Sequence, residues 1–321
     1  MSAVASATLR LRASILDRVQ DSPVAADAYE VLGVSANASD EELRRAYRRR
    51  LRQTHPDTGG EAREFTAVQL AWEKVGTTAA RADYDSGRTV PRETFEARAA
   101  SPRRDTRPTA RSYGHPGGWR RERYLTLIRE WAGRGTHLDN PYDPPLVRSA
   151  PRDIRHILAD ALAEESSARL LGQLGIAFTL WHDVATAGGP DEKIDHVVLG
   201  PTGLFAMLSE DWGGPVRVRK GEIVGEALDH GEHPFASLAA RSRQLSRAAR
   251  VRFDAFVVVV PDDATDAGLT LAGRLRGIPT ALVARSRLPE LMRDGLPGTP
   301  PVGGSELFEI RSRLQAVVRF V

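Results

Sequence analysis

Cysteine is absent from this chain of 321 residues. Its absence excludes disulfides and thiolate metal sites, and it fits a reducing compartment such as the cytoplasm. Long apolar runs are missing too. The longest, Phe256 to Val260, has only the length of a strand, whereas a membrane-spanning helix needs roughly 20 apolar residues. We therefore expect a cytoplasmic protein that does not associate with membranes.

A strong excess of one charge is also missing from most of the chain, although the pI is 9.4. The positive charge gathers in residues 87–121, where nine arginines accompany three acidic residues. Residues 150–321 hold 20 basic and 22 acidic side chains, which argues against a nucleic-acid-binding domain there. The arginine-rich segment could bind nucleic-acid phosphates without sequence preference, or it could be a solubilising spacer. Composition leaves both interpretations open.

The length suffices for about two domains, because single cores rarely exceed roughly 250–300 residues. We predict four segments: an N-terminal extension (1–25), a helical module (26–87), a basic linker (88–149) and an α/β module (150–321). The linker is rich in Arg and Pro, a composition that favours a flexible tether. Apolar spacing predicts one helix within it, over 119–132.

A helical hairpin is predicted for the second segment. Ser39 and Glu42 form a capping box that begins a helix, and Pro56 ends it, because a residue before proline is driven out of the α region. A second helix with apolar spacing runs from Phe65 to Val75. Apolar residues share one face of the first helix, and its opposite face carries Arg44, Arg45, Arg48, Arg49 and Arg52.

In order and spacing these features resemble the J-domain family. The residues that carry the resemblance are Asp27–Val34, Ser39–Glu42, Ala46–Arg49, His55-Pro56-Asp57, Phe65, Ala71-Trp72 and Tyr84-Asp85. The resemblance implies a partner, a DnaK-type chaperone ATPase, whose ATP hydrolysis rises when His55, Pro56, Asp57 and the arginine face dock on it. Arg50 and Thr54 depart from the family pattern. We expect Arg50, where the family usually has an apolar residue, to reach out from the edge of the helix pair.

A mixed α/β sandwich is predicted for residues 150–321. Periodicity favours helices over 152–175, 234–250 and 288–292, and a last helix that is capped near Ser305. Strand patterns cover 176–181, 194–199, 204–208, 255–260 and 280–283, and a hairpin over 216–224 turns at Lys220-Gly221.

Part of this module resembles the nuclease-related domain, a branch of the restriction-endonuclease-like fold. The resemblance rests on Ala163-Glu164, Ile194–Phe205 and Asp211–Gly214. In that family an aspartate and the glutamate of a Glu-x-Lys triplet hold a metal ion, and the lysine assists the attacking water.

The resemblance implies a degenerate site in this chain. Glu164 and Asp195 match family positions, but Leu208 stands where the ligand glutamate belongs and Glu210 stands where the lysine belongs. Leucine cannot bind a hard cation. Glu210 could still point toward Asp195 from the same strand face, and Lys193 could supply the missing positive charge.

Three functions follow from these residues. The first is a co-chaperone whose α/β module recruits a client or another partner, with no enzymatic activity and no cofactor. The second is a Mg²⁺-dependent nuclease acting through Asp195, Glu210, Glu164 and Lys193. The third is a non-catalytic protein that binds nucleic acid through the arginine-rich linker. The histidines show no convincing metal spacing, so we predict no metal site and assign loop or surface positions to His182, His230 and His233.

Overall fold

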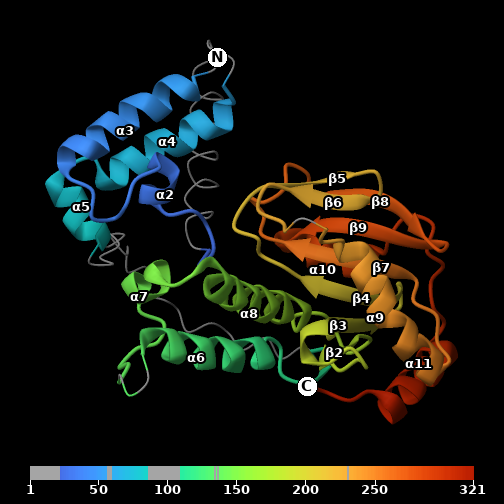
Figure 1. Ribbon diagram of the computed structural model, residues 1–321. Helices are drawn as coiled ribbons and strands as arrows, with labels where there is room; N and C mark the ends of the chain where they lie inside the picture. The colour runs from blue at the N-terminus through green and yellow to red at the C-terminus, as the bar shows by residue number, and fades with distance from the viewer. Residues whose placement is uncertain (1–21, 56–59, 86–108, 134, 136, 230) are drawn as a thin grey trace, which may run out of the picture. The chain divides into compact units, whose positions relative to one another are not determined.

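The computed structural model describes residues 22–55, 60–85, 109–133, 135, 137–229 and 231–321 (Figure 1). They form two compact units. The helical unit comprises the described parts of 25–85 and 135–151, and the α/β unit comprises residues 22–24 together with the described parts of 109–133 and 152–321. Residues 1–21 of the expected extension and 88–108 of the expected linker lie outside the described residues. Within the described ranges, no helix has the length and apolar character needed to cross a membrane.

The helical unit is built around an antiparallel helix pair. Its helices are α2 (Ala28–Leu32), α3 (Asp40–Gln53), α4 (Ala62–Val75), α5 (Thr78–Asp85) and α7 (Pro144–Ser149). The predicted capping box begins α3, because the Glu42 amide donates to Ser39 and the Ser39 amide donates to the Glu42 carboxylate. The Tyr47 and Trp72 rings stack with centroids 4.4 Å apart. Around them a core forms from Ala28, Tyr29, Leu32, Leu43, Val68, Ala71 and Val75.

A mixed seven-stranded sheet organises the α/β unit, in the order β1-β2-β3-β4-β7-β9-β8. Strands β2, β3 and β4 form an antiparallel meander, whereas β4, β7 and β9 are mutually parallel. Its strands are β1 (Arg111–Tyr113), β2 (Thr179–Val184), β3 (Ile194–Gly200), β4 (Gly203–Ser209), β7 (Ala255–Val260), β8 (Leu269–Leu275) and β9 (Ile278–Ala284). A separate hairpin consists of β5 (Val216–Arg219) and β6 (Glu222–Gly225). The predicted mixed α/β fold is confirmed.

Helices cover both faces of this sheet. One face packs on α8 (Arg152–Leu171) and α10 (Leu288–Asp294), through residues such as Leu171, Leu288 and Met292. The other face packs on α9 (Pro234–Ala249) and α11 (Gly304–Val317), through Phe235 and Leu314 among others. Because both faces are covered, β3, β4 and β7 are buried along their whole length, as expected for central strands.

Helix α6 (Gly118–Ala132) forms where the sequence predicts a helix over 119–132, and it packs on α8 within the α/β unit. Tyr124 and Ile128 are fully buried. Arg121 Nε donates to Glu165 Oε1 at 2.7 Å. This helix is therefore part of the α/β unit and no tether.

Several boundaries differ from the sequence prediction. Strand β2 begins at Thr179, three residues later than predicted, because residues 172–178 form a turn after α8. Helix α11 begins at Gly304 after an N-cap, Gly303, that has no side-chain hydrogen bond, so the predicted cap near Ser305 is wrong. Strand β8 was not predicted. As an edge strand it alternates exposed and half-buried residues, and Gly273 interrupts its pattern with a register shift.

Candidate functional site

The arginine face of α3 is exposed, as predicted for a docking surface. Leu43 and Ala46 on the opposite face are buried in the helical core. Arg45 lies 3.3 Å from Glu41 one turn earlier, and Arg52 Nε donates to the Arg48 carbonyl at 3.2 Å. The exposed cations are Arg44, Arg45, Arg48, Arg49 and Arg52. An exposed cationic helix face attracts and orients an acidic partner.

His55 follows this helix directly, while Pro56 and Asp57 lie outside the described residues. The His55 ring meets the Phe65 ring edge-on, with centroids 5.0 Å apart. The Gly60 amide donates to the His55 carbonyl at 3.0 Å and closes the loop. A Cβ on Gly60 would lie only 2.3 Å from the Thr54 carbonyl carbon, so this position requires glycine.

The two departures from the family pattern have structural roles. Arg50 is half-buried, and its Nε donates to the Val31 carbonyl at 3.2 Å, which joins α3 to the end of α2. Thr54 is buried, and its hydroxyl donates to the Arg50 carbonyl at 2.9 Å, which closes the last turn of α3. Both side chains support the helix whose exposed face carries the arginines.

Helix α5 is tied to the start of the unit by polar contacts that sequence reasoning missed. The Tyr29 hydroxyl donates to Asp85 at 2.7 Å, and the Ala28 amide donates to the Tyr84 hydroxyl at 3.1 Å. Arg81 donates to the Tyr29 hydroxyl at 3.1 Å. Burial, then the hydrogen bond with Asp85, raises the pKa of Tyr29 to about 12. These bonds explain structurally why Tyr84-Asp85 belongs to the recognised pattern.

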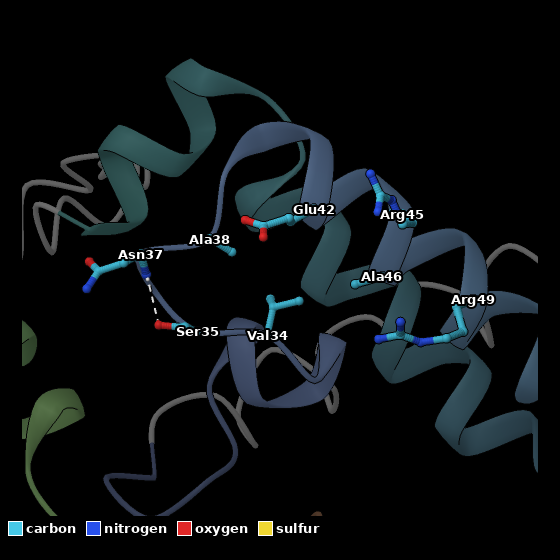
Figure 2. A pocket seen from close by; sticks show the side chains of 8 residues that line it. All are labelled: Val34, Ser35, Asn37, Ala38, Glu42, Arg45, Ala46 and Arg49. Carbon is cyan, nitrogen blue, oxygen red and sulfur yellow. Dashed lines mark hydrogen bonds between the residues drawn. The ribbon is translucent and has the colours of Figure 1, made fainter.

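A shallow depression of about 410 Å³ adjoins the arginine face (Figure 2). Val34 and Ala46 contribute its apolar surface, and Arg45 and Arg49 stand along one side. The remaining lining residues are Ser35, Asn37, Ala38 and Glu42. The start of α3 thus offers apolar surface and positive charge side by side.

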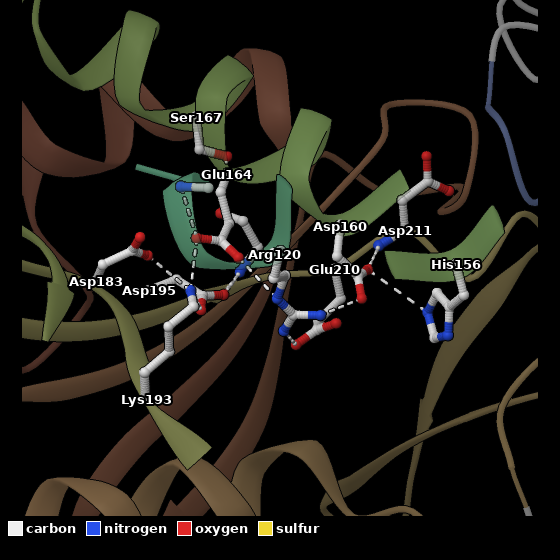
Figure 3. Close-up of polar contacts among 12 residues, drawn as sticks. Arg120, His156, Asp160, Glu164, Ser167, Asp183, Lys193, Asp195, Glu210 and Asp211 are labelled. Carbon is white, nitrogen blue, oxygen red and sulfur yellow. Dashed lines mark hydrogen bonds and ion pairs between the residues drawn. The ribbon is translucent and has the colours of Figure 1, made fainter. Parts of the chain in front are cut away.

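The second candidate site is a buried ionic cluster in the α/β unit (Figure 3). Lys193 Nζ lies 2.6 Å from Glu164, 2.6 Å from Asp195 and 2.8 Å from Asp183. All four side chains are at most 1% exposed. The ammonium group therefore occupies the point where the three carboxylates converge, so a divalent cation does not fit there while Lys193 is in place.

Arg120 of α6 links this group to a second set of carboxylates (Figure 3). Its Nε lies 2.8 Å from Glu164 Oε1, its Nη2 lies 3.3 Å from Glu210 Oε1, and Nη1 contacts Asp160. The Glu210 side chain thus pairs with Arg120, and no contact with Asp195 is found among the described residues. Arg120 was missed from the sequence because it lies 40 residues before Asp160, in the segment that was predicted to be a linker.

Charge and burial set the proton affinities in this cluster. Burial raises the pKa of Glu164, and the neighbouring Asp195 charge raises it further. Burial also acts to raise the pKa of Asp195, but the charges of Lys193 and Arg120 outweigh it and hold that pKa at about 2. Burial lowers the pKa of Lys193, yet Asp195 and Glu164 outweigh burial and raise it overall. Lys193 and Asp195 are therefore both charged at neutral pH.

A second set of candidate metal ligands lies beside Arg120. His156, Asp160 and Glu210 offer ligand atoms within 4.8 Å of one another. Arg120 contacts both carboxylates of this set, so its guanidinium already pairs with the oxygens that would hold an ion. Leu208 packs in the hydrophobic core and contributes no ligand.

His182 is buried in β2, so its predicted loop or surface position is wrong. Its Nδ1 lies 2.8 Å from His196 Nδ1, and its Nε2 lies 3.0 Å from Ser112 Oγ. His196 Nε2 lies 3.1 Å from Ser209 Oγ, which in turn donates to Ser167 at 2.8 Å. Burial, and then the neighbouring imidazole, lowers the pKa of His182 to about 3. His233 precedes α9 and is exposed, which confirms its predicted surface position, and His230 lies outside the described residues.

Comparison with known proteins identifies the helical segment. Residues 27–85 match the model of the DnaJ domain family. The chaperone protein DnaJ of Thermosynechococcus vestitus is 46% identical over 65 residues, which cover 19% of this chain and 17% of that protein. The DnaJ proteins of Bordetella bronchiseptica and Geobacillus kaustophilus are 44% and 41% identical over 63 and 73 residues, covering 18% and 22% of this chain and 17% and 19% of theirs.

The N-terminal segment is therefore a J-domain. The match spans less than a fifth of the length of these relatives, and it does not extend to the α/β unit. No solved structure matches the chain.

Proposed function

We propose that this protein is a co-chaperone that stimulates the ATPase of a DnaK-type chaperone. The proposal rests on the J-domain match over residues 27–85, combined with the exposed arginine face of α3 directly before His55. Five exposed cations on one helix face favour an acidic partner surface, and His55 just after this helix supplies an imidazole for hydrogen bonding.

Steady-state ATP hydrolysis by the DnaK-type chaperone of the same organism tests this proposal. We expect the full chain to raise the rate of ATP hydrolysis. In a His55→Gln variant this increase in rate should be at least about ten-fold smaller. The Arg48→Ala/Arg49→Ala variant should also stimulate less than wild type. Its matched control is Arg123→Ala/Arg129→Ala, which removes the same charge from exposed positions of α6 and should behave like wild type. Equal stimulation by wild type and His55→Gln would refute the proposal.

We further propose that the α/β unit recruits a client protein or another partner rather than acting as an enzyme. It has its own seven-stranded sheet with a core on each face, so it is a domain in its own right. Lys193 and Arg120 pair with the carboxylates of its polar cluster and occupy the points where those carboxylates converge. This arrangement supports a binding scaffold that needs no cofactor.

A metal-dependent nuclease is the alternative, because the Glu164 and Asp195 carboxylates lie close together, each 2.6 Å from the Lys193 ammonium. The ammonium at that point and the apolar Leu208 argue against it, since a nuclease of this kind needs open oxygen ligands for a hard cation. Incubation of the full chain with supercoiled plasmid and Mg²⁺ or Mn²⁺ should leave the plasmid intact. Cleavage by wild type that disappears in Asp195→Asn would establish the nuclease instead.

A further inference from the structure

Exposed cations gather at one end of the sheet in the α/β unit, where strands β7 and β9 begin. Strands β7 and β9 are parallel, with Phe256 opposite Thr280, so the segments that precede them lie side by side. These are the loop after α9 (250–254) and the β8–β9 turn (276–277). The two segments and the end of β8 carry Arg250, Arg252, Arg274 and Arg276, all exposed. We call these four residues the basic edge.

Direct contacts hold the basic edge together. Arg252 Nη2 lies 3.9 Å from the point that a Cβ on Gly277 would occupy, and Arg274 Nη1 donates to the Gly277 carbonyl at 2.9 Å. Arg313 of α11 reaches the same surface, because its Nη1 donates to the Arg250 carbonyl at 3.4 Å. Three stretches that are distant in sequence, around residues 250–252, 274–276 and 313, thus contribute cations to one surface.

The guanidinium groups of the basic edge have no carboxylate partner. Among the described residues, none of the four lies within 4.0 Å of an acidic oxygen. Asp254 is the acidic residue of the same loop, but it is half-buried and accepts the Leu204 amide at 2.8 Å. Glu309 is paired with Arg313 at 2.9 Å. Asp254 lies near enough to Arg252 for the guanidinium charge to act on its carboxyl, but the four exposed guanidinium groups form no direct ion pair among the described residues.

Two of these arginines occupy backbone positions that disfavour them. Arg250 has a φ of 53° at the end of α9, and Arg276 has a φ of 52° in the β8–β9 turn. Glycine and asparagine adopt this left-handed conformation more easily than arginine, and Asn-Gly is the preferred pair in a two-residue hairpin turn. Cations held at strained positions, without an ion-pair partner to explain them, point to a function of the exposed charge.

Burial also changes the charge balance that the sequence indicates for residues 150–321. Six of the 22 acidic side chains in this range are buried, whereas only Arg155 and Lys193 are buried among the 20 cations. The buried acids are Asp160, Glu164, Asp183, Asp195, Glu210 and Asp211. The near-neutral composition therefore conceals a surface on which cations outnumber acids. That composition was the reason for expecting no nucleic-acid contact in this unit.

We propose that the basic edge binds the sugar-phosphate backbone of nucleic acid. Arginine presents a planar fork that matches phosphate oxygens with two hydrogen bonds. Binding at an exposed edge through phosphates alone is independent of base sequence and strongly dependent on salt. The inference concerns a different unit from the J-domain and does not depend on co-chaperone activity.

Fluorescence anisotropy with a labelled 30-base-pair DNA duplex tests this proposal on the full chain. The variant Arg250→Asn/Arg276→Asn removes two charges and places a better-suited residue at each strained position, so it should fold at least as stably as wild type. We expect its affinity at 100 mM salt to fall about three- to ten-fold and its salt slope to fall by roughly 2.

The matched control is Arg287→Asn/Arg293→Asn. Both arginines are exposed and follow the opposite end of β9, roughly 20 Å away along the strand. This control should bind like wild type. Equal binding by all three proteins would assign DNA binding to other arginines, such as those of 87–121, and would overturn the proposal. Competition by polyglutamate as effective as that by unlabelled DNA at equal charge would overturn it too, in favour of an acidic protein partner.

Discussion

Lys193 and Asp195 are two residues apart in sequence, and their side chains form an ion pair of 2.6 Å in the interior of the protein. Lys193 stands directly before β3, and Asp195 is the second residue of that strand. The pair places a positive charge at the point where the Glu164, Asp183 and Asp195 carboxylates converge. The contribution of this ion pair to the stability of the α/β unit can be tested by mutation.

Replacing Lys193 with Met should destabilise the α/β unit severely. The change leaves Glu164, Asp183 and Asp195 buried without the cation that they share, and breaking a buried ion pair typically costs about 3–5 kcal/mol. Urea unfolding followed by tryptophan fluorescence would report the loss, because Trp181 and Trp212 are buried in this unit. The control is Lys220→Met, at an exposed hairpin position, which should change the unfolding free energy by less than about 0.5 kcal/mol. A mild effect of Lys193→Met would mean that the carboxylates are protonated in the fold.

The buried pair of His182 and His196 should make the free energy of unfolding fall as the pH is lowered. The pKa values of His182 and His196 are lowered to about 3 and about 4, in both cases mainly by burial. The unfolded chain takes up these protons near pH 6.5 and the folded chain does not, so their contribution to stability is lost as pH falls below 6.5. At pH 5 each histidine would lower the free energy of unfolding by about 2 kcal/mol relative to its value above pH 6.5.

A His182→Gln variant isolates this effect. Between pH 7 and pH 5 it should lose less unfolding free energy than wild type loses, as measured by urea titration at each pH. Asp160 and Glu164 have raised pKa values, chiefly because of burial, and they shift stability in the opposite sense, but they are present in both proteins. Parallel pH profiles for the two proteins would show that the histidine pair is protonated without penalty.

Arg81 should be essential for the stability of the J-domain. Its guanidinium donates to the Tyr29 hydroxyl, to Asp40 and to the Ala36 carbonyl, all within 3.1 Å. Arg81→Ala should lower the unfolding free energy of this unit by about 1–3 kcal/mol, and Arg81→Lys should not restore it, because an ammonium lacks the planar fork. Thermal unfolding monitored by circular dichroism checks this. Arg49→Ala, at an exposed position of α3, serves as the control and should melt like wild type.

Gly60→Ala should uncouple the fold of the J-domain from its activity. The added Cβ would clash with the Thr54 backbone, so the loop between α3 and α4 must shift while the core around Leu43 and Val68 remains. We expect helical content like that of wild type and at least about a three-fold loss of ATPase stimulation. Glu61→Ala, at the neighbouring exposed position, is the control. Full stimulation by Gly60→Ala would show that the loop tolerates the shift.

The sequence allowed the helical unit to be predicted closely because its signals are local. The capping box at Ser39 and the apolar spacing of α3 and α4 act within one or two helical turns, and the structure has them as predicted. The sequence analysis proposed Lys193 as a source of positive charge, but it did not predict that Lys193 forms ion pairs with Glu164 and Asp195.

Other features depend on contacts between distant residues and gave no local signal. Arg120 lies 90 residues before Glu210, and Ser112 lies 70 residues before His182. The His182–His196 pair arises because these residues face each other across two antiparallel strands. A histidine within an apolar strand was predicted to lie at a loop or surface, because the strand was placed three residues too early.

The contact of Tyr84 with Arg148 bears on how such a protein can be divided. The Arg148 guanidinium lies 4.9 Å from the Tyr84 ring centroid, and its Nη2 donates to the Tyr84 carbonyl at 2.8 Å. Helix α7 therefore belongs to the J-domain's own packing, although 58 residues lie between Asp85 and its first residue, Pro144. A fragment ended at the family boundary would lose this helix, and a chimera that exchanged residues 27–85 for another J-domain would leave α7 without its matched surface. The compact helical unit is discontinuous in sequence, so a transplant that preserves its packing must carry two pieces of the chain.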